Sequence, residues 1–171
     1  MAKRIGKEHE MKGLVVTIGA TAAALALMFG LSVASASSSS ARAGTKVAVV
    51  DSKLGRILVD GRGRTLYLFA KESKGKSACS GACAAYWPPL IATGKPQAVA
   101  GAKASLLGTT RRADGRLQVT YHHHPLYRFS GDTNSGLTSG QGLDDFGGKW
   151  WVVSPAGEKI ASTTATPNPG Y

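Results

Sequence analysis

The stretch TYHHHPLYRFSGDTNSGLTSGQGLDDFGGKWWVVS, residues 120–154, carries most of the information about the fold. It holds two of the three tryptophans and three of the four histidines of the chain. Together with the residues just before it, this stretch repeats a segment found sixty residues earlier, without a gap over eighteen positions. The matching segments are Gly55–Val59 with Gly115–Val119, Leu66–Phe69 with Leu126–Phe129, and Glu72 with Asp132. Such self-similarity indicates an internal duplication.

The length and the charge of the chain limit its class. A chain of 171 residues is about one domain and can bury one modest core. Its 21 Lys and Arg against 10 Asp and Glu give a net charge of +11, which favours anionic surroundings such as an envelope polymer or a membrane surface. The basic residues are scattered, which argues against specific nucleic-acid binding. Solubility alone is the other explanation of this charge.

Residues 1–36 have the pattern of an export signal. Basic residues precede an apolar run from Leu14 to Leu31, and the small residues Ala34–Ala36 fit a cleavage site. The run is nearly long enough to span a bilayer, so an uncleaved N-terminal anchor is the alternative. A start at Met11 would give a shorter leader. We expect an exported protein, secreted, periplasmic or on the outer face of the cytoplasmic membrane, with a flexible tether at residues 37–45.

Short apolar segments separated by glycine-rich turns predict a mainly β domain over residues 46–160. The predicted fold has two duplicated hairpin-based halves that share one core, with repeat 1 at about 46–92 and repeat 2 at about 108–158. A strand at Lys149–Ser154 alternates its tryptophans and valines between two faces. Residues 161–171 lack periodicity and are expected to form a disordered tail.

Aromatic residues two positions apart mark the same strand in each repeat. Tyr67 and Phe69 share one face of it, as do Tyr127 and Phe129, so we expect this face to be the inner one. Plain core packing is the simplest role for these rings. The acids that follow the two strands, Glu72 and Asp132, are expected to tie down matching loops. An acid–base pair is the catalytic alternative.

Cys79 and Cys83 are the two cysteines of the chain. In an exported protein a disulfide is the default, and here it closes a loop of only five residues. The alternatives are a metal pair or a redox dithiol, whereas a haem-attachment motif is absent. The segment from Cys79 to Trp87 is expected to form a short helical turn, which Pro88–Pro89 must end.

The run His122–His124 is a candidate metal site, since imidazole is a common ligand of copper and zinc. On a strand, His122 and His124 would point the same way. The repeat instead aligns them with Arg62–Arg64, which belong to a predicted hairpin turn, so exposed turn histidines are the alternative. The acids that could complete a metal site are Asp132, Asp144 and Asp145. The last two could equally cap backbone N–H groups in a tight loop.

The segment Tyr127-Arg-Phe129-Ser-Gly-Asp132 resembles the Tyr-x-aromatic-x-x-Asp motif of a bacterial family of exported proteins and lipoproteins, the "secreted repeat of unknown function" family. Tyr67-Leu-Phe69-Ala-Lys-Glu72 has the same pattern with Glu for Asp. Supporting stretches are Cys79–Ala84, Trp87–Leu90, Tyr121–Tyr127, Gly140–Gly142 and Phe146–Trp150. The resemblance implies an exported repeat domain and no established reaction. This chain departs from many members in lacking a lipid-accepting cysteine, and in having His122-His123 where an Asn-Gly pair is common.

No motif in the sequence joins a nucleophile to a base and an orienting group. The sequence therefore favours a non-catalytic envelope or secreted module that binds a ligand or partner through a basic, aromatic surface, without a cofactor. The alternative is an extracytoplasmic metal-binding or redox accessory protein that uses His122–His124 and nearby acids with copper or zinc.

Overall fold

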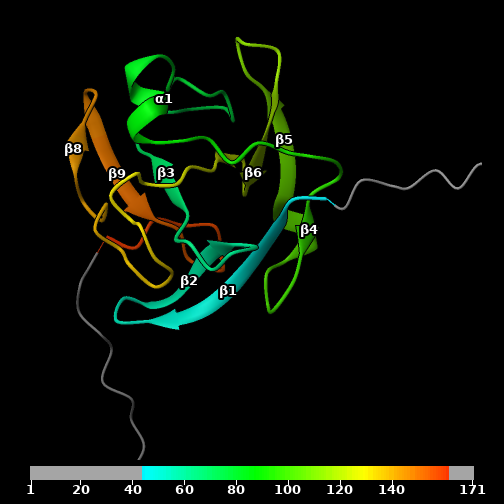
Figure 1. The fold of residues 1–171 in the computed structure, drawn as a ribbon. Coiled ribbons are helices and arrows are strands. Elements are labelled where there is room, and N and C mark those ends of the chain that lie inside the picture. The colour runs from blue at the N-terminus through cyan, green and yellow to red at the C-terminus, as the bar shows by residue number, and fades with distance from the viewer. Residues whose placement is uncertain (1–43, 162–171) are drawn as a thin grey trace, which may run out of the picture. The chain divides into compact units, whose positions relative to one another are not determined.

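The structure is a computed structural model that describes residues 44–161. In chain order the elements are β1 (Lys46–Ser52), β2 (Gly55–Asp60), β3 (Tyr67–Phe69), α1 (Ala82–Tyr86), β4 (Gln97–Ala98), the 3-10 turn η1 (Ala104–Leu106), β5 (Leu107–Arg111), β6 (Leu117–Tyr121), β7 (His124–Pro125), β8 (Asp144–Asp145) and β9 (Gly148–Val152). The strands form three small sheets in the orders β2-β1-β4, β3-β9-β8 and β5-β6-β7 (Figure 1). The prediction of a mainly β, duplicated fold is confirmed.

Each half begins with a hairpin whose turn is set by its own residues. In the β1–β2 hairpin, Ser52 donates its hydroxyl to the carbonyl of Gly55 at 2.8 Å, and Gly55 has a φ of 87°. In the β5–β6 hairpin, the Asp114 carboxylate accepts the N–H of Arg116 at 3.0 Å, and Gly115 has a φ of 80°. Glycine adopts these positive φ angles without a steric penalty, so the two turns form at equivalent places.

The two halves meet at a pair of equivalent residues. Tyr67 and Tyr127 are sixty positions apart, and each donates its N–H to the carbonyl of the other, at 2.9 and 3.0 Å. A residue that pairs mutually with its own repeat equivalent lies on an approximate two-fold axis. The duplication is therefore expressed as internal two-fold symmetry around this bridge.

The last segment of each repeat lies on the hairpin of the other repeat. Residues 88–92 bond to repeat 2, where Leu90 donates to the carbonyl of Leu126 at 2.8 Å. In the reciprocal arrangement β9 pairs antiparallel with β3, and the carbonyl of Val153 accepts the N–H of Leu58 at 2.8 Å. The halves thus exchange their final segments, and neither completes its sheet alone.

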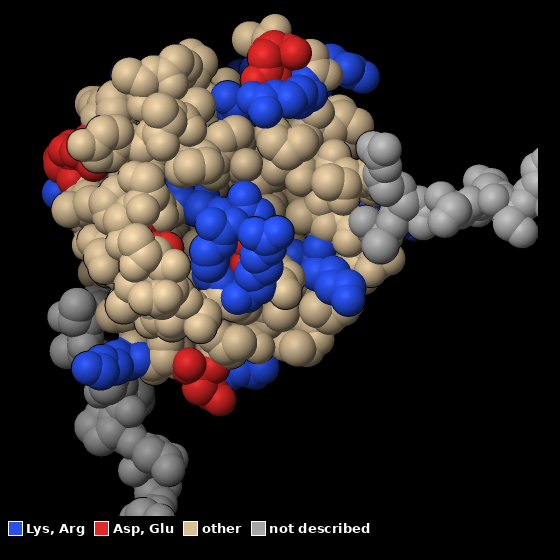
Figure 2. Space-filling view, in the orientation of Figure 1, with Lys and Arg blue, Asp and Glu red and all other residues tan. Residues whose placement is uncertain are grey.

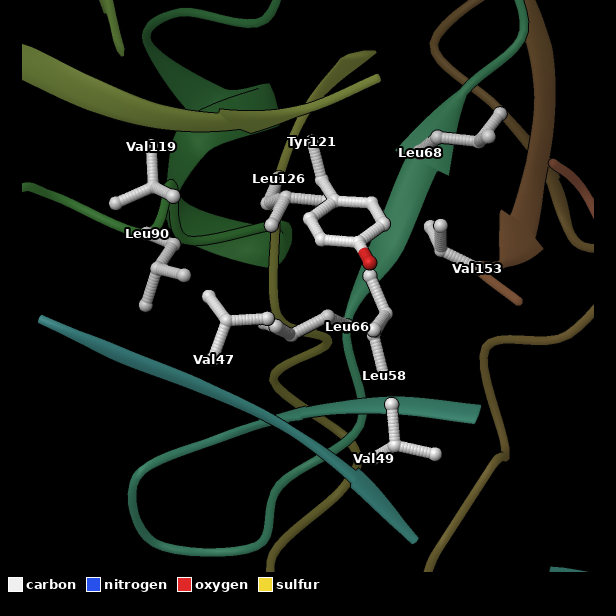
Figure 3. Close-up of a cluster of buried hydrophobic side chains, with 10 residues drawn as sticks. All are labelled: Val47, Val49, Leu58, Leu66, Leu68, Leu90, Val119, Tyr121, Leu126 and Val153. Carbon is white, nitrogen blue, oxygen red and sulfur yellow. The ribbon is translucent and has the colours of Figure 1, made fainter. Parts of the chain in front are cut away.

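Both halves contribute to two clusters of buried side chains. One cluster contains Leu58, Leu66 and Leu68 from repeat 1 with Val119, Leu126 and Val153 from repeat 2 (Figure 3). The other holds the aromatic motif residues described below. Both faces of β3 are therefore buried, and the expectation of a single inner face was incomplete. The alternation of β9 is as predicted, because Trp150 and Val152 face the aromatic cluster while Val153 faces the aliphatic one.

The helix α1 and a disulfide occupy the region where the helical turn was expected. Cys79 and Cys83 are bonded, with their Cα atoms 5.3 Å apart. Gly81, between them, has a φ of 55°. The prediction of a disulfide is confirmed, and α1 ends at Tyr86, just before Trp87 and the two prolines.

The boundary of the folded part differs slightly from the expectation. Gly44 is buried, and its Cα lies so close to the Lys95 carbonyl that a Cβ would meet it at 1.9 Å. The Thr45 hydroxyl donates to the Ile91 carbonyl at 3.0 Å. These two residues were assigned to the tether and are instead part of the domain. The expected leader, the start at Met11 and all but the first residue of the expected tail lie outside the described residues. Among residues 44–161, no helix is long and apolar enough to cross a membrane.

Candidate functional site

The motif tyrosines bond to acids across the two-fold axis. Tyr67 of repeat 1 donates its hydroxyl to Oδ2 of Asp132 in repeat 2, at 2.5 Å. Tyr127 of repeat 2 donates to Oε1 of Glu72 in repeat 1. Each acid also accepts a loop N–H, Asp132 from Ser139 at 2.9 Å and Glu72 from Ala78 at 2.7 Å. Each acid therefore fixes the loop that follows it by accepting a backbone N–H, and the tyrosine hydroxyl connects that loop to the other repeat.

Four aromatic rings form a continuous stack beside these pairs. The order is Phe69, Trp150, Trp87 and Phe129, with centroids 4.2, 4.0 and 4.5 Å apart. The stack alternates between repeats, and the two tryptophans lie together at its centre. Tyr67 meets Trp87 edge-on at 5.3 Å, and Tyr127 meets Trp150 at 5.1 Å. Offset and edge-to-face contacts of this kind add to the stabilisation from buried area.

Most of the motif aromatics lie in the core. The side chains of Tyr67, Phe69, Tyr127, Trp87 and Trp150 are at most 2 % exposed. Phe129 is only partly buried, at the end of the stack. The rings that the sequence marked therefore join the repeats and present little surface to a ligand.

The carboxyl group of Glu72 is strongly perturbed by its burial. Burial raises its pKa to about 7, although the bonds from Tyr127 and Ala78 and the charge of Arg112 oppose the shift. Its Oε2 atom is buried and has no hydrogen-bond partner within residues 44–161. Burial and the adjacent carboxylates also raise the pKa values of Tyr67 and Tyr127 above their usual range. Both tyrosines stay protonated at neutral pH, which makes them poor bases and nucleophiles.

A buried arginine connects this region to the disulfide. Arg112 is 6 % exposed and donates to the Ser77 hydroxyl at 2.6 Å, the Gln118 side-chain oxygen at 2.7 Å and the Cys79 carbonyl at 2.7 Å. It lines a hollow of about 650 Å³, together with residues of α1 and of the β5–β6 turn. The terminal nitrogens of Arg112 donate all three of these hydrogen bonds, so its side chain holds the surrounding loop in place.

The histidine run forms the turn between β6 and β7. His122 and His123 have φ angles of 48° and 66°, so both central positions of this two-residue turn are left-handed. His122 and His123 therefore occupy a turn, whereas His124 begins β7 (His124–Pro125) and is half-buried. His122 Nδ1 lies 3.1 Å from the exposed carboxylate of Glu158. Burial lowers the pKa of His124, which favours its neutral form.

The acids considered as further metal ligands lie elsewhere. Asp144 and Asp145 form β8 rather than the caps of a loop, and Asp144 makes an ion pair with Lys149 at 3.5 Å. Asp132 is bonded to Tyr67. Within residues 44–161, no three His, Cys, Asp or Glu side chains are close enough to hold a metal ion.

An arginine cluster that sequence reasoning missed surrounds Asp60 at the end of β2. We call Asp60, Arg62, Arg64 and Arg128 the Asp60 cluster. The carboxylate of Asp60 is 3 % exposed; Oδ1 accepts the N–H groups of Arg62 and Arg64, and Oδ2 accepts Nε of Arg128 at 2.6 Å. Although burial opposes it, these bonds hold the pKa of Asp60 below its usual range. One sign of this cluster was present in the sequence: repeat 2 has Arg128 at the position that Leu68 occupies in repeat 1.

Basic residues outnumber acidic residues in the domain. Residues 44–161 contain sixteen Lys and Arg and eight Asp and Glu, which leaves a net charge of +8. On the face shown in Figure 2, basic side chains gather near the centre, around the turn between β2 and β3. This turn follows Asp60 and carries Arg62 and Arg64 of the Asp60 cluster, so the buried acid lies beneath a basic surface.

These features define a class of protein, a two-fold symmetric β domain whose repeats exchange strands and bind each other's acids. A family model described as "secreted repeat of unknown function" matches residues 48–91 and 108–154, more than half of the chain. The chain belongs to this family, and the predicted resemblance is confirmed. The two matches correspond to the two halves of the fold. No curated protein and no solved structure gives a significant match.

Proposed function

We propose that this protein is a non-catalytic binding module that acts outside the cytoplasm and holds an anionic polymer of the cell envelope. The observation that carries the proposal is the Asp60 cluster, in which the guanidinium groups of Arg64 and Arg128 are both held by one buried acid on a domain of net charge +8. Arginines fixed in this way form a rigid cationic surface that loses little side-chain freedom when an anion binds.

The distribution of the remaining charge suits a polymer better than a small ligand. Basic residues spread over the domain can each contact successive anionic groups of one chain, and each contact releases counterions. Individually weak contacts then add up within one complex. Such binding weakens steeply as the salt concentration rises.

The support for a binding role over catalysis comes from the state of the motif residues. The two tyrosines are buried and protonated, and each of their acids accepts one tyrosine hydroxyl and one loop N–H. A catalytic acid or base needs access to a substrate proton. The motif therefore acts in our proposal as the framework that positions the basic surface.

Co-sedimentation of the exported protein with an insoluble phosphodiester polymer tests the proposal, with a neutral polysaccharide as the control. We expect retention on the anionic polymer at about 50 mM salt and release at about 500 mM, since salt screens contacts with a polyanion. Equal retention on the neutral polysaccharide, or none on the anionic one at low salt, would contradict the proposal.

A role in binding copper or zinc is the second candidate. The observation in its favour is that His124 and Glu158 line the same hollow of about 240 Å³, and His122 lies against Glu158. Imidazole and carboxylate groups suit either metal. A metal-dependent rise in the thermal midpoint of the parent protein that His122→Asn/His123→Gly abolishes would support this role.

A further inference from the structure

We propose that Arg64 and Arg128 together form a binding site for one phosphodiester group, and that the domain binds the anionic polymer at this site. The inference rests on the proposed function and gives it a ligand class and a location.

A single carboxylate oxygen holds both arginines. Oδ2 of Asp60 accepts Nε of Arg128 at 2.6 Å and Nε of Arg64 at 3.3 Å, and Nη2 of Arg64 also lies at 3.3 Å. Oδ1 is taken by the two backbone N–H groups of the turn, from Arg62 at 2.8 Å and Arg64 at 3.1 Å. The acceptor sites of the carboxylate are therefore filled, and both guanidinium groups are held at the same oxygen atom.

The local charge is unbalanced. One negative charge faces the positive charges of Arg64 and Arg128, with Arg62 on the same turn and the Lys46 side chain against Gly61. The side chains of Arg64 and Arg128 are 33 % and 24 % exposed, so water screens their repulsion only in part. Within residues 44–161, Asp60 is the one side-chain acceptor for both groups. A second anion on the outer side would bind their remaining N–H groups and offset the repulsion.

The arrangement of donors favours a phosphodiester over a carboxylate. A carboxylate has two coplanar oxygens, which suit the fork of one guanidinium group. The two free oxygens of a phosphodiester lie on a tetrahedral centre and point in different directions, so each can accept from a different arginine. The single negative charge of a diester also matches the charge left over after Asp60 has neutralised one of the pair.

The site occurs once in the duplicated domain. The repeat equivalents of Asp60, Arg64 and Arg128 are Thr120, His124 and Leu68. The equivalent corner lacks the buried acid and both arginines. We therefore expect one phosphodiester site per domain, despite the two-fold symmetry of the fold.

Two measurements test the site on the exported protein. The first follows the arginine Nε–H signals by NMR during titration with glycerophosphoglycerol, a small diester that carries one phosphate. We expect the signals of Arg64 and Arg128 to shift together and to saturate with one diester per domain. Shifts spread evenly over exposed arginines, or a stoichiometry of two, would overturn the inference.

The second measurement compares variants for binding to an oligomer of glycerol phosphate and to polyglutamate of similar charge. Arg64→Lys and Arg128→Lys keep the charge and lose the forked donors. We expect each to weaken phosphodiester binding about tenfold while changing polyglutamate binding about twofold or less. The double variant Lys53→Gln/Lys95→Gln is the matched control and should weaken both polymers alike. Lysine variants that bind the phosphodiester oligomer as the parent does would overturn the site, and thermal melts show whether each variant is folded.

The outcomes separate this inference from the proposed function. If the lysine variants bind like the parent while salt-sensitive polymer binding persists, the specific site is wrong and the binding module stands. If the small diester shifts both arginine signals but no polymer is retained, the site stands and the polymer-binding function is wrong. A parallel assay with phosphatidylglycerol vesicles distinguishes the sources of the group, because binding confined to vesicles would overturn the polymer as the ligand.

Discussion

Tyr127, in the second repeat, donates its hydroxyl hydrogen to the carboxyl group of Glu72, 55 residues earlier in the first repeat. The reciprocal bond runs from Tyr67 to Asp132. The motif of each repeat is therefore completed by the acid of the other, and the loop after one strand is held by the strand of its partner. Because of this arrangement, we expect the two halves to fold together and the loss of one crossed bond to destabilise the whole domain.

Replacement of Tyr67 by Phe removes one crossed bond without changing the ring. The Asp132 carboxylate, which is 3 % exposed, would retain the Ser139 N–H and lose its hydroxyl donor. We expect a loss of about 1–3 kcal/mol in the free energy of unfolding, measured by denaturant titration, because a buried acceptor is left short of a partner. Tyr86→Phe is the control, since Tyr86 is 58 % exposed, and its cost should stay within about 0.5 kcal/mol. Equal costs for the two variants would refute a structural role for the crossed bond.

The raised pKa of Glu72 predicts that the stability of the folded protein depends on pH. Burial raises it to about 7 from an ordinary value of 4.5, so the folded protein holds a proton that the unfolded chain has lost. The stabilisation is fully present below about pH 4.5 and is lost as the pH rises through about 7, by at most about 3 kcal/mol. Thermal melts across this range should show a fall in midpoint that Glu72→Gln abolishes. Glu158→Gln, at an exposed carboxyl, should leave the fall intact; if it removes the fall instead, another group is responsible.

The equivalent residues Phe69 and Phe129 should differ in importance. Phe69 is 2 % exposed and stacks on Trp150, whereas Phe129 is partly buried at the other end of the stack. Phe69→Ala should cost roughly 3–5 kcal/mol. Phe129→Ala should cost about 1–3 kcal/mol, because less apolar area is removed from water there. The order is checked by denaturant titration of both variants, and a larger loss at Phe129 would contradict the burial argument.

The disulfide should matter little to global stability. It closes a loop of five residues, so Cys79→Ser should lower the free energy of unfolding by no more than about 2 kcal/mol. Arg112 still bonds to the Cys79 carbonyl in the variant, which keeps the loop in place. Alkylation of the unreduced, denatured protein followed by mass measurement tests the bond itself. Two labelled thiols in freshly exported protein would show that the disulfide does not form in the cell.

The sequence allowed the repeats, the mainly β fold, the disulfide and the histidine turn to be predicted, because each rests on a local pattern or on the offset of sixty residues. The offset shows which residues are equivalent. It does not show whether Tyr67 bonds to Glu72 of its own repeat or to Asp132 of the other, since that choice depends on the exchange of final segments. The Asp60 cluster was missed because Asp60 looked like an ordinary turn residue, and its burial beneath Arg128 arises only when the two repeats meet.

The left-handed turn at His122 and His123 should lower the stability of the domain. Their φ angles of 48° and 66° are unfavourable for residues with a Cβ, although His adopts them more readily than most. The double variant His122→Asn/His123→Gly should therefore gain up to about 1 kcal/mol in the free energy of unfolding. The contact between His122 and Glu158 lost in this variant is largely exposed and offsets little of that gain.

The same variant decides between a turn and a metal site. A ligand that binds only the folded protein raises its thermal midpoint, so a copper or zinc site that includes His122 would raise the midpoint of the parent and not that of the variant. We expect both proteins to respond alike to micromolar metal, with the variant slightly more stable throughout. His124→Asn is the companion control, because it removes an imidazole from β7 and leaves both left-handed positions unchanged. A large, stoichiometric metal shift in the parent that both variants lose would establish the metal site and reject the interpretation of these histidines as a turn alone.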